Sequence, residues 1–97
     1  MMTIVEGDFE WDDVKAASNV VKHDVTFQEA ALALASDPNE VSFDDLLDPS
    51  RIHSLVLSPR DRVLLVITTE AGARTRIISA RKADTHEQRS YLQSFSP

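Results

Sequence analysis

Four of the ten basic residues in this chain fall between positions 74 and 82. The four are Arg74, Arg76, Arg81 and Lys82. The β-branched pair between them, Ile77 and Ile78, favours a strand, and Gly72 just upstream marks a turn. Basic groups on a rigid strand that face away from an apolar sheet can hold a phosphate. The segment therefore predicts an anion-binding site on the face of a sheet.

Arg76 and Arg81 are the first candidates for phosphate contacts, because a guanidinium can donate two parallel hydrogen bonds to one phosphate. Arg51 and Arg62, from neighbouring predicted strands, are second candidates. Strict alternation puts positions 76 and 81 on opposite faces, so they converge only if the strand twists or ends near Ala80. For each arginine, the competing interpretation is a solvated strand face or an ion pair with an acidic residue from the first half of the chain.

Charge is unevenly distributed along the sequence. The net charge is −6, yet residues 1–50 hold 12 acidic and 2 basic residues, whereas residues 51–97 hold 4 acidic and 8 basic residues. If the halves stay distinct in the fold, the molecule is an electrostatic dipole. The plainer interpretation is a solubilising acidic face. A protein that simply coats DNA or RNA would more often be basic overall.

Length and composition favour a small soluble protein. The 97 residues suit one domain, residues 1–97, with a modest core. The chain has no cysteine, which excludes disulfides and thiolate metal sites and suits a reducing cytosol. No apolar run approaches the roughly 20 residues that span a bilayer, and the N-terminus lacks the basic flank of a signal peptide. We expect a cytoplasmic protein that does not engage a membrane.

Several other chemistries lack their sequence signatures. The acidic residues Asp44, Asp45 and Asp48 lack the glycine and the ligand spacing of a calcium loop. The three histidines show no zinc spacing. There is no glycine-rich phosphate loop, and no serine lies in a nucleophile elbow. The sequence therefore predicts neither a metal nor a cofactor.

Hydrophobic spacing and capping residues predict the elements that position the basic strand. Helices are predicted over residues 13–23, over residues 27–36 and after Asp84, and strands over residues 4–10, 41–43, 52–57, 62–69 and 74–80. The resulting order is β-α-α-β-β-β-β-α. We expect an α+β fold in which two N-terminal helices and one C-terminal helix pack on an antiparallel sheet.

Local signals also predict how the helices begin. Asp12 is the expected N-cap of the first helix, and Trp11 is expected to plug the core between strand and helix. Thr26 and Glu29 form a predicted capping box, in which each side chain bonds to the other residue's backbone N–H. Asp84 is the expected N-cap of the last helix.

Short motifs follow one another in a specific order. The first is F-E-W-D at residues 9–12, accompanied by Lys15, Asn19 and Lys22-His23. The later motifs are T-F-Q-E-A at residues 26–30, Asp37-Pro38, R-I-I-S-A-R at residues 76–81, and Glu87 with Tyr91. Together, from residue 8 to residue 92, they resemble the BrnT toxin family.

The resemblance implies a compact RelE-like fold and a type II toxin that cleaves RNA and arrests translation without a metal. It also implies a BrnA antitoxin that neutralises the toxin and binds operator DNA in the complex. On this view the chain acts on an RNA substrate and meets DNA only through its antitoxin.

Such RNA cleavage needs a base for the 2′-hydroxyl proton, an acid for the 5′ leaving oxygen and cations for the phosphorane. The candidate catalytic cations are Arg76, Arg81 and Arg51. The candidate RNA contacts are Arg62, Arg74, Lys82 and Tyr91. No acid or base is evident, since His23, His53 and His86 are each weak candidates alone. Tyr91 could also donate a proton, although a tyrosine among apolar helix residues is more often part of a core.

Two functions therefore remain open. The first is a ribonuclease toxin whose arginines bind the scissile phosphate. The second is a BrnT-like module with weak or no nuclease activity that acts by binding its antitoxin and regulating its own transcription. The acidic charge balance and the lack of an obvious proton carrier favour the second, and toxicity on expression separates the two.

Overall fold

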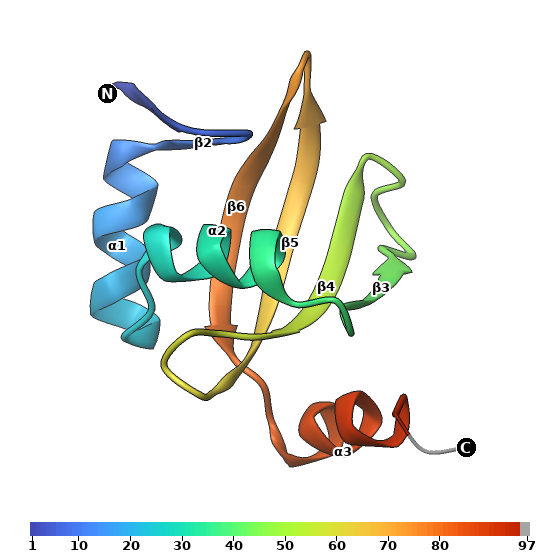
Figure 1. Cartoon of the computed structure of the whole chain (residues 1–97). Helices are drawn as coiled ribbons and strands as arrows, with labels where there is room; N and C mark the ends of the chain where they lie inside the picture. Colours follow the sequence, from blue (N-terminus) through green and yellow to red (C-terminus); the bar gives the residue numbers. More distant parts are fainter. Residues whose placement is uncertain (96–97) are drawn as a thin grey trace.

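A six-stranded sheet forms the centre of residues 1–95, the part of the chain that the computed structural model describes (Figure 1). The strands are β1 (Thr3–Glu6), β2 (Phe9–Asp12), β3 (Val41–Asp44), β4 (Arg51–Leu57), β5 (Val63–Ala71) and β6 (Arg74–Lys82), and the helices are α1 (Asp13–His23), α2 (Phe27–Ser36) and α3 (Thr85–Gln93). Across the sheet the order is β1-β2-β6-β5-β4-β3. The α+β class is confirmed, and β5 is central as its apolar sequence requires.

The N-terminal segment corrects the predicted topology. The single strand expected over residues 4–10 is instead a hairpin, in which β1 and β2 pair antiparallel. Gly7 occupies the turn at φ +59°, a left-handed conformation that glycine adopts without strain. β2 then pairs parallel with β6, with Glu10 opposite Arg76. The sheet is therefore mixed, and the expectation of a purely antiparallel sheet is wrong at this pair.

The three predicted helix N-caps are confirmed. Asp12, Thr26 and Asp84 each accept a hydrogen bond from the backbone N–H three residues later, at 2.8–3.0 Å. Only the return half of the Thr26 capping box is wrong. The Glu29 carboxylate turns instead to the guanidinium of Arg62, and a charged pair is a stronger interaction than a bond to a neutral N–H.

Two apolar clusters lie on opposite faces of the sheet. On the first face, which we call the covered face, α2 lies across the strands (Figure 1) and contributes Phe27 and Ala30 to a cluster with Leu64 and Val66. Trp11 joins this cluster edge-to-face with Phe27, which confirms its expected place in the core. On the second face a smaller cluster lies beneath α3, and its members are Leu55, Leu65, Ala83 and Tyr91.

Helix α1 is attached to β6 through the buried side-chain amide of Asn19, whereas two of its valines are exposed. Val14 and Val21, whose spacing helps to predict this helix, are exposed. Asn19 is buried and donates to the carbonyl oxygens of Val25 and Ala80, at 2.9 and 2.7 Å. It also accepts from the Ala80 N–H at 3.2 Å. One side chain thus occupies both backbone groups of a β6 residue, as a neighbouring strand would.

Candidate functional site

A β-bulge in β6 decides which way the basic side chains point. Ile67 pairs with Ser79, but the next residue of β5, Thr68, pairs with Ile77. One residue of β6, Ile78, is therefore extra. An extra residue shifts the alternation of a strand by one position, so side chains before and after it that would face opposite ways come to the same face.

The bulge brings Arg76 and Arg81 onto one face. Arg76 lies opposite Thr69, and Arg81 lies opposite Leu65. Thr69 and Leu65 are four positions apart in β5 and share a face, as do residues directly paired across strands. Arg51 is also opposite Thr69, from β4, so all three predicted catalytic arginines lie on the face that α3 partly covers. We call it the arginine face.

The register sets the scale of the arginine face. Arg76 and Arg51 are separated by the one intervening strand β5, a backbone distance of about 10 Å at the usual strand spacing. The rows of Arg76 and Arg81 are four β5 residues apart, about 13 Å along the strands. Long side chains at these positions frame one patch of the sheet rather than three separate sites.

Each of these arginines has a carboxylate partner. Arg76 donates to Glu10 on β2 at 2.5 Å, and Arg51 lies 3.3 Å from Asp48 in the loop before β4. These two pairs realise the competing interpretation, in which an acid from the first half of the chain neutralises the arginine. Both guanidinium side chains nevertheless keep part of their surface accessible, 31% for Arg76 and 41% for Arg51.

Arg81 is held by the C-terminal helix. It donates two hydrogen bonds to the carboxylate of Glu87, at 2.8 and 2.9 Å. The Glu87 pKa is lowered by this bond, and the Arg81 pKa is raised by it. Glu87 also accepts from the backbone N–H of Asp84 at the start of α3. The same carboxylate therefore orders the helix N-terminus and orients one arginine of the face.

His53, a weak candidate in the sequence, also lies on the arginine face. It lies two residues after Arg51 in β4, on the same face, and opposite Ile67. Its Nε2 is 2.9 Å from the carboxylate of Asp45. That bond, together with backbone N–H groups of the loop, lowers the Asp45 pKa to about 2. The sequence signal was the i, i+2 spacing of arginine and histidine on a strand, which places both on one face.

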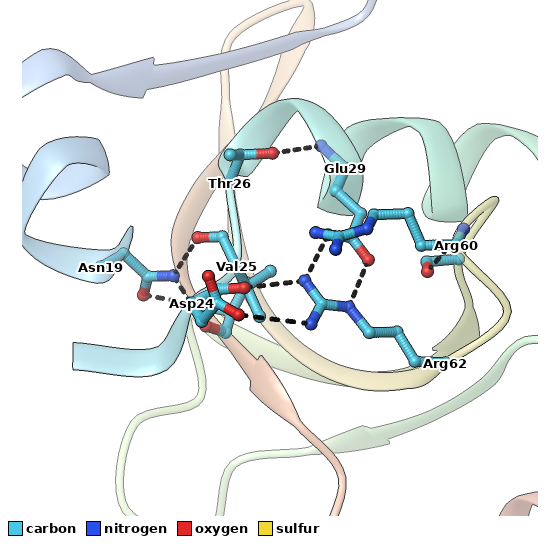
Figure 2. Close-up of polar contacts among 9 residues, drawn as sticks. Asn19, Asp24, Val25, Thr26, Glu29, Arg60 and Arg62 are labelled. Atoms are coloured by element: carbon cyan, nitrogen blue, oxygen red, sulfur yellow. Dashed lines mark hydrogen bonds and ion pairs between the residues drawn. The ribbon is translucent and has the colours of Figure 1, made fainter. Parts of the chain in front are cut away.

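Arg62, a predicted RNA contact, lies apart from the arginine face. Its guanidinium donates to both carboxylate oxygens of Glu29, at 2.8 and 2.6 Å, and to the carbonyl oxygen of Asp24 at 2.7 Å. Figure 2 shows Arg62 reaching from its loop to the start of α2. The Glu29 pKa is lowered by this bond, and its side chain is only 5% exposed. Arg62 acts as a strut between the β4–β5 loop and the helices.

The remaining predicted RNA contacts divide between surface and core. Arg74 is exposed and opposite Ala71, at the tip of the arginine face. Lys82 is exposed at the far end of β6, where its pairing with Leu64 points it toward the covered side. Tyr91 is 2% exposed, and its hydroxyl donates to Asp37 at 2.6 Å. Burial and this hydrogen bond raise the Tyr91 pKa to about 12.

Residues 1–95 also bear on metal binding and on membrane crossing. No group of three His, Asp or Glu side chains in this part of the chain is arranged to hold a metal ion. No helix among these residues combines the length and apolar character needed to cross a bilayer. The candidate site is thus a set of arginines, one histidine and their carboxylate partners on a sheet face.

Two comparisons with known proteins find similarity, one to a family model and one to a solved structure. The family model described as the ribonuclease toxin BrnT of type II toxin–antitoxin systems matches residues 11–87. The fold resembles the 1.1 Å crystal structure of the Brucella abortus ribonuclease toxin BrnT, with a TM-score of 0.63 and 22% sequence identity; the match covers 77% of this chain and 94% of that chain. A search of curated proteins finds no match. The family match spans most of the sequence, and the chain therefore belongs to the BrnT family of ribonuclease toxins of type II toxin–antitoxin systems.

Proposed function

We propose that this chain is a toxin of RelE-like fold that cleaves cytoplasmic RNA without a metal and so inhibits translation. One observation carries the proposal. The bulge at Ile78 puts Arg51, Arg76 and Arg81 on a single accessible sheet face. Guanidinium groups bind phosphate bidentately and stabilise the charge of a phosphorane. Three of them around one patch suit a scissile phosphate and its neighbours.

The partner of this toxin is a BrnA-like antitoxin, through which the complex contacts operator DNA. We propose that the antitoxin covers the arginine face, because masking the cations is the simplest way to neutralise them. Its docking segment is then acidic, since an acidic segment would be attracted to this face. The carboxylates of Glu10, Asp48 and Glu87 already occupy the positions that such a segment would take.

The test is growth after tightly controlled induction of the wild type and of the Arg76→Ala/Arg81→Ala double variant, with total RNA examined in both. Loss of these donors should lower RNA cleavage by about 10²–10³-fold or more, judged from the removal of single transition-state donors in other enzymes. Arg60→Ala is the matched control, because Arg60 is exposed and its one ion pair within residues 1–95 is with Glu29 on the covered side, at 3.7 Å. Full toxicity of the double variant would refute this site.

The second candidate function is a module that binds its antitoxin and regulates transcription with little nuclease activity. It is favoured by the pairing of Arg51, Arg76 and Arg81 each with a carboxylate, and by the net charge of −6. Under this alternative, induction of the folded wild type leaves both growth and RNA intact. The same induction experiment therefore decides between the two functions.

A further inference from the structure

The imidazole of His53 is held in one orientation by groups from β3 and from the loop that follows it. Asp45, in the loop after β3, lies 2.9 Å from Nε2. Asp45 is itself oriented, because its other oxygen accepts from the backbone N–H groups of Leu47 and Asp48, at 2.8 and 2.9 Å. The ring of Phe43, opposite His53 on β3, lies against the imidazole at a centroid distance of 5.2 Å.

This arrangement sets the tautomer of the neutral ring. An ionised carboxylate can only accept hydrogen bonds, so the proton of the neutral imidazole resides on Nε2 and the lone pair on Nδ1. Asp45 is ionised over the working pH range, because its pKa is lowered to about 2. Among residues 1–95, Nδ1 of His53 makes no hydrogen bond, and no buried side-chain nitrogen lacks a partner. The basic nitrogen is therefore not fully buried, in a side chain that is 20% exposed.

The basic nitrogen belongs to the row next to the arginines proposed to bind phosphate. Arg51 precedes His53 by two residues on the same face, and its row also holds Arg76. Adjacent rows of a strand face are about 7 Å apart. A phosphate gripped by the Arg51 row would thus present its neighbouring ribose over the row of His53. The other positions of the His53 row are uncharged: Phe43, Ile67 and Ser79.

We propose that His53, positioned by Asp45, is the general base of RNA cleavage on the arginine face. This inference rests on the proposed ribonuclease function and supplies the proton acceptor that the sequence left unassigned. Nδ1 takes the proton of a ribose 2′-hydroxyl, and the 2′-oxygen bonds to the adjacent phosphorus. The bond from phosphorus to the 5′-oxygen breaks, that oxygen takes a proton from water, and the imidazolium returns its proton to solvent. The products are a 2′,3′-cyclic phosphate and a 5′-hydroxyl end.

The experiment measures cleavage of a short, 5′-labelled, mixed-sequence RNA by the full chain as a function of pH. His53→Gln should lower kcat by about 10²-fold or more, with little change in KM, and should abolish the pH-dependent limb that reports deprotonation of the base. Asp45→Asn should lower kcat by a smaller factor, because the imidazole remains but its tautomer is no longer fixed. Phe43→Leu is the control that keeps the apolar packing, and it should lower kcat by the smallest factor of the three variants.

Two controls keep the outcomes apart. Binding of a 2′-O-methyl version of the same RNA reports the arginines alone, and should be unchanged in His53→Gln. If the wild type cleaves RNA and His53→Gln matches its kcat and pH profile, the general base is wrong while the proposed function stands. If folded wild type does not cleave RNA, the proposed function fails and this inference with it. Nitrogen-15 NMR of the ring gives a readout besides activity: a proton on Nδ1 in the neutral ring would overturn the assignment.

Discussion

Glu29 and Glu10 each accept hydrogen bonds from an arginine, on opposite faces of the same sheet. On the covered side, the Glu29 side chain is 5% exposed and that of its partner Arg62 is 19% exposed. On the arginine face, the side chains of the three paired arginines, Arg51, Arg76 and Arg81, are 31 to 41% exposed. The pairing chemistry is the same in both regions, so an ion pair alone does not reveal whether an arginine serves the fold or a ligand. Exposure separates the two roles, because a buried charge needs its partner and an accessible one can exchange it.

Breaking the ion pair between Glu29 and Arg62 on the covered side should lower stability more than any other change proposed below. Glu29→Gln removes the nearest counter-charge of the largely buried Arg62 guanidinium and leaves only the exposed carboxylate of Asp24, at 4.0 Å. Breaking such a pair costs about 3 kcal/mol. Urea unfolding should show a lower midpoint at an unchanged slope. Arg60→Ala tests the same carboxylate through an exposed partner, and should cost less than about 1 kcal/mol. Equal losses in the two variants would contradict the role of burial.

The attachment of α3 to the arginine face should respond to high pH. In the folded protein, burial and the bond to Asp37 raise the Tyr91 pKa from 10.0 to about 12. Below pH 10 the hydroxyl is protonated in both states, and its contribution is fully present. Between pH 10 and 12 the unfolded chain loses this proton first, so the free energy of unfolding falls as pH rises, and the contribution is lost as pH passes through about 12.

The size of this fall is about 2 to 3 kcal/mol, from 1.36 kcal/mol per pKa unit. Chemical denaturation of the wild type and of Tyr91→Phe between neutral pH and pH 12 measures it. The variant cannot ionise at this position, so its stability should fall less steeply over the same range. Parallel curves would contradict a buried, hydrogen-bonded Tyr91.

Asn19 tests whether the bulged strand depends on the covered side. Asn19→Ala leaves the Ala80 N–H and two carbonyl groups without their buried partner, which costs about 2 kcal/mol. Hydrogen exchange should become faster at Ala80 and its neighbours in β6. Val21→Ala, in the same helix but exposed, is the control and should change stability by less than about 0.5 kcal/mol. Unchanged exchange in Asn19→Ala would mean that β6 holds its shape without α1.

The same contrast explains what the sequence could predict. Helix caps such as Asp12 and Thr26 depend on residues within one turn, so local patterns were sufficient for them. The apolar run of β5 likewise predicted its central place. The turn at Gly7 carries a local signal as well, although the sequence analysis predicts one strand across it. The parallel pairing of β2 with β6 depends on residues 66 positions apart, and no local pattern contains it.

The candidate site shows the same limit. Residue types alone single out Arg76 and Arg81 as candidates for phosphate contacts. Their position on one face of the sheet depends on the extra residue at Ile78. A bulge belongs to a pair of strands, so a single strand's alternation predicted opposite faces. The role of Arg62 was hidden for a similar reason, since its partner Glu29 is 33 residues away. The sequence makes His53 only a weak candidate for an acid or base, because the aspartate that orients it comes from a loop with no recognisable motif.

Controls aside, Glu10→Gln is expected to change stability least, and it should strengthen RNA binding. Glu10→Gln removes the carboxylate that neutralises Arg76, at a stability cost within about 1 kcal/mol, because the pair is partly open to solvent. The freed guanidinium is then available to a phosphate, so binding of 2′-O-methyl RNA should tighten and its dependence on salt should steepen by about one counterion. Fluorescence anisotropy across a salt series measures both quantities, and the double variant Glu10→Gln/Arg76→Ala should lose the gain. If Glu10→Gln destabilised the fold as much as Glu29→Gln and left RNA binding unchanged, Arg76 would be a structural strut like Arg62. The distinction between the two faces would then fail at the residue on which it most depends.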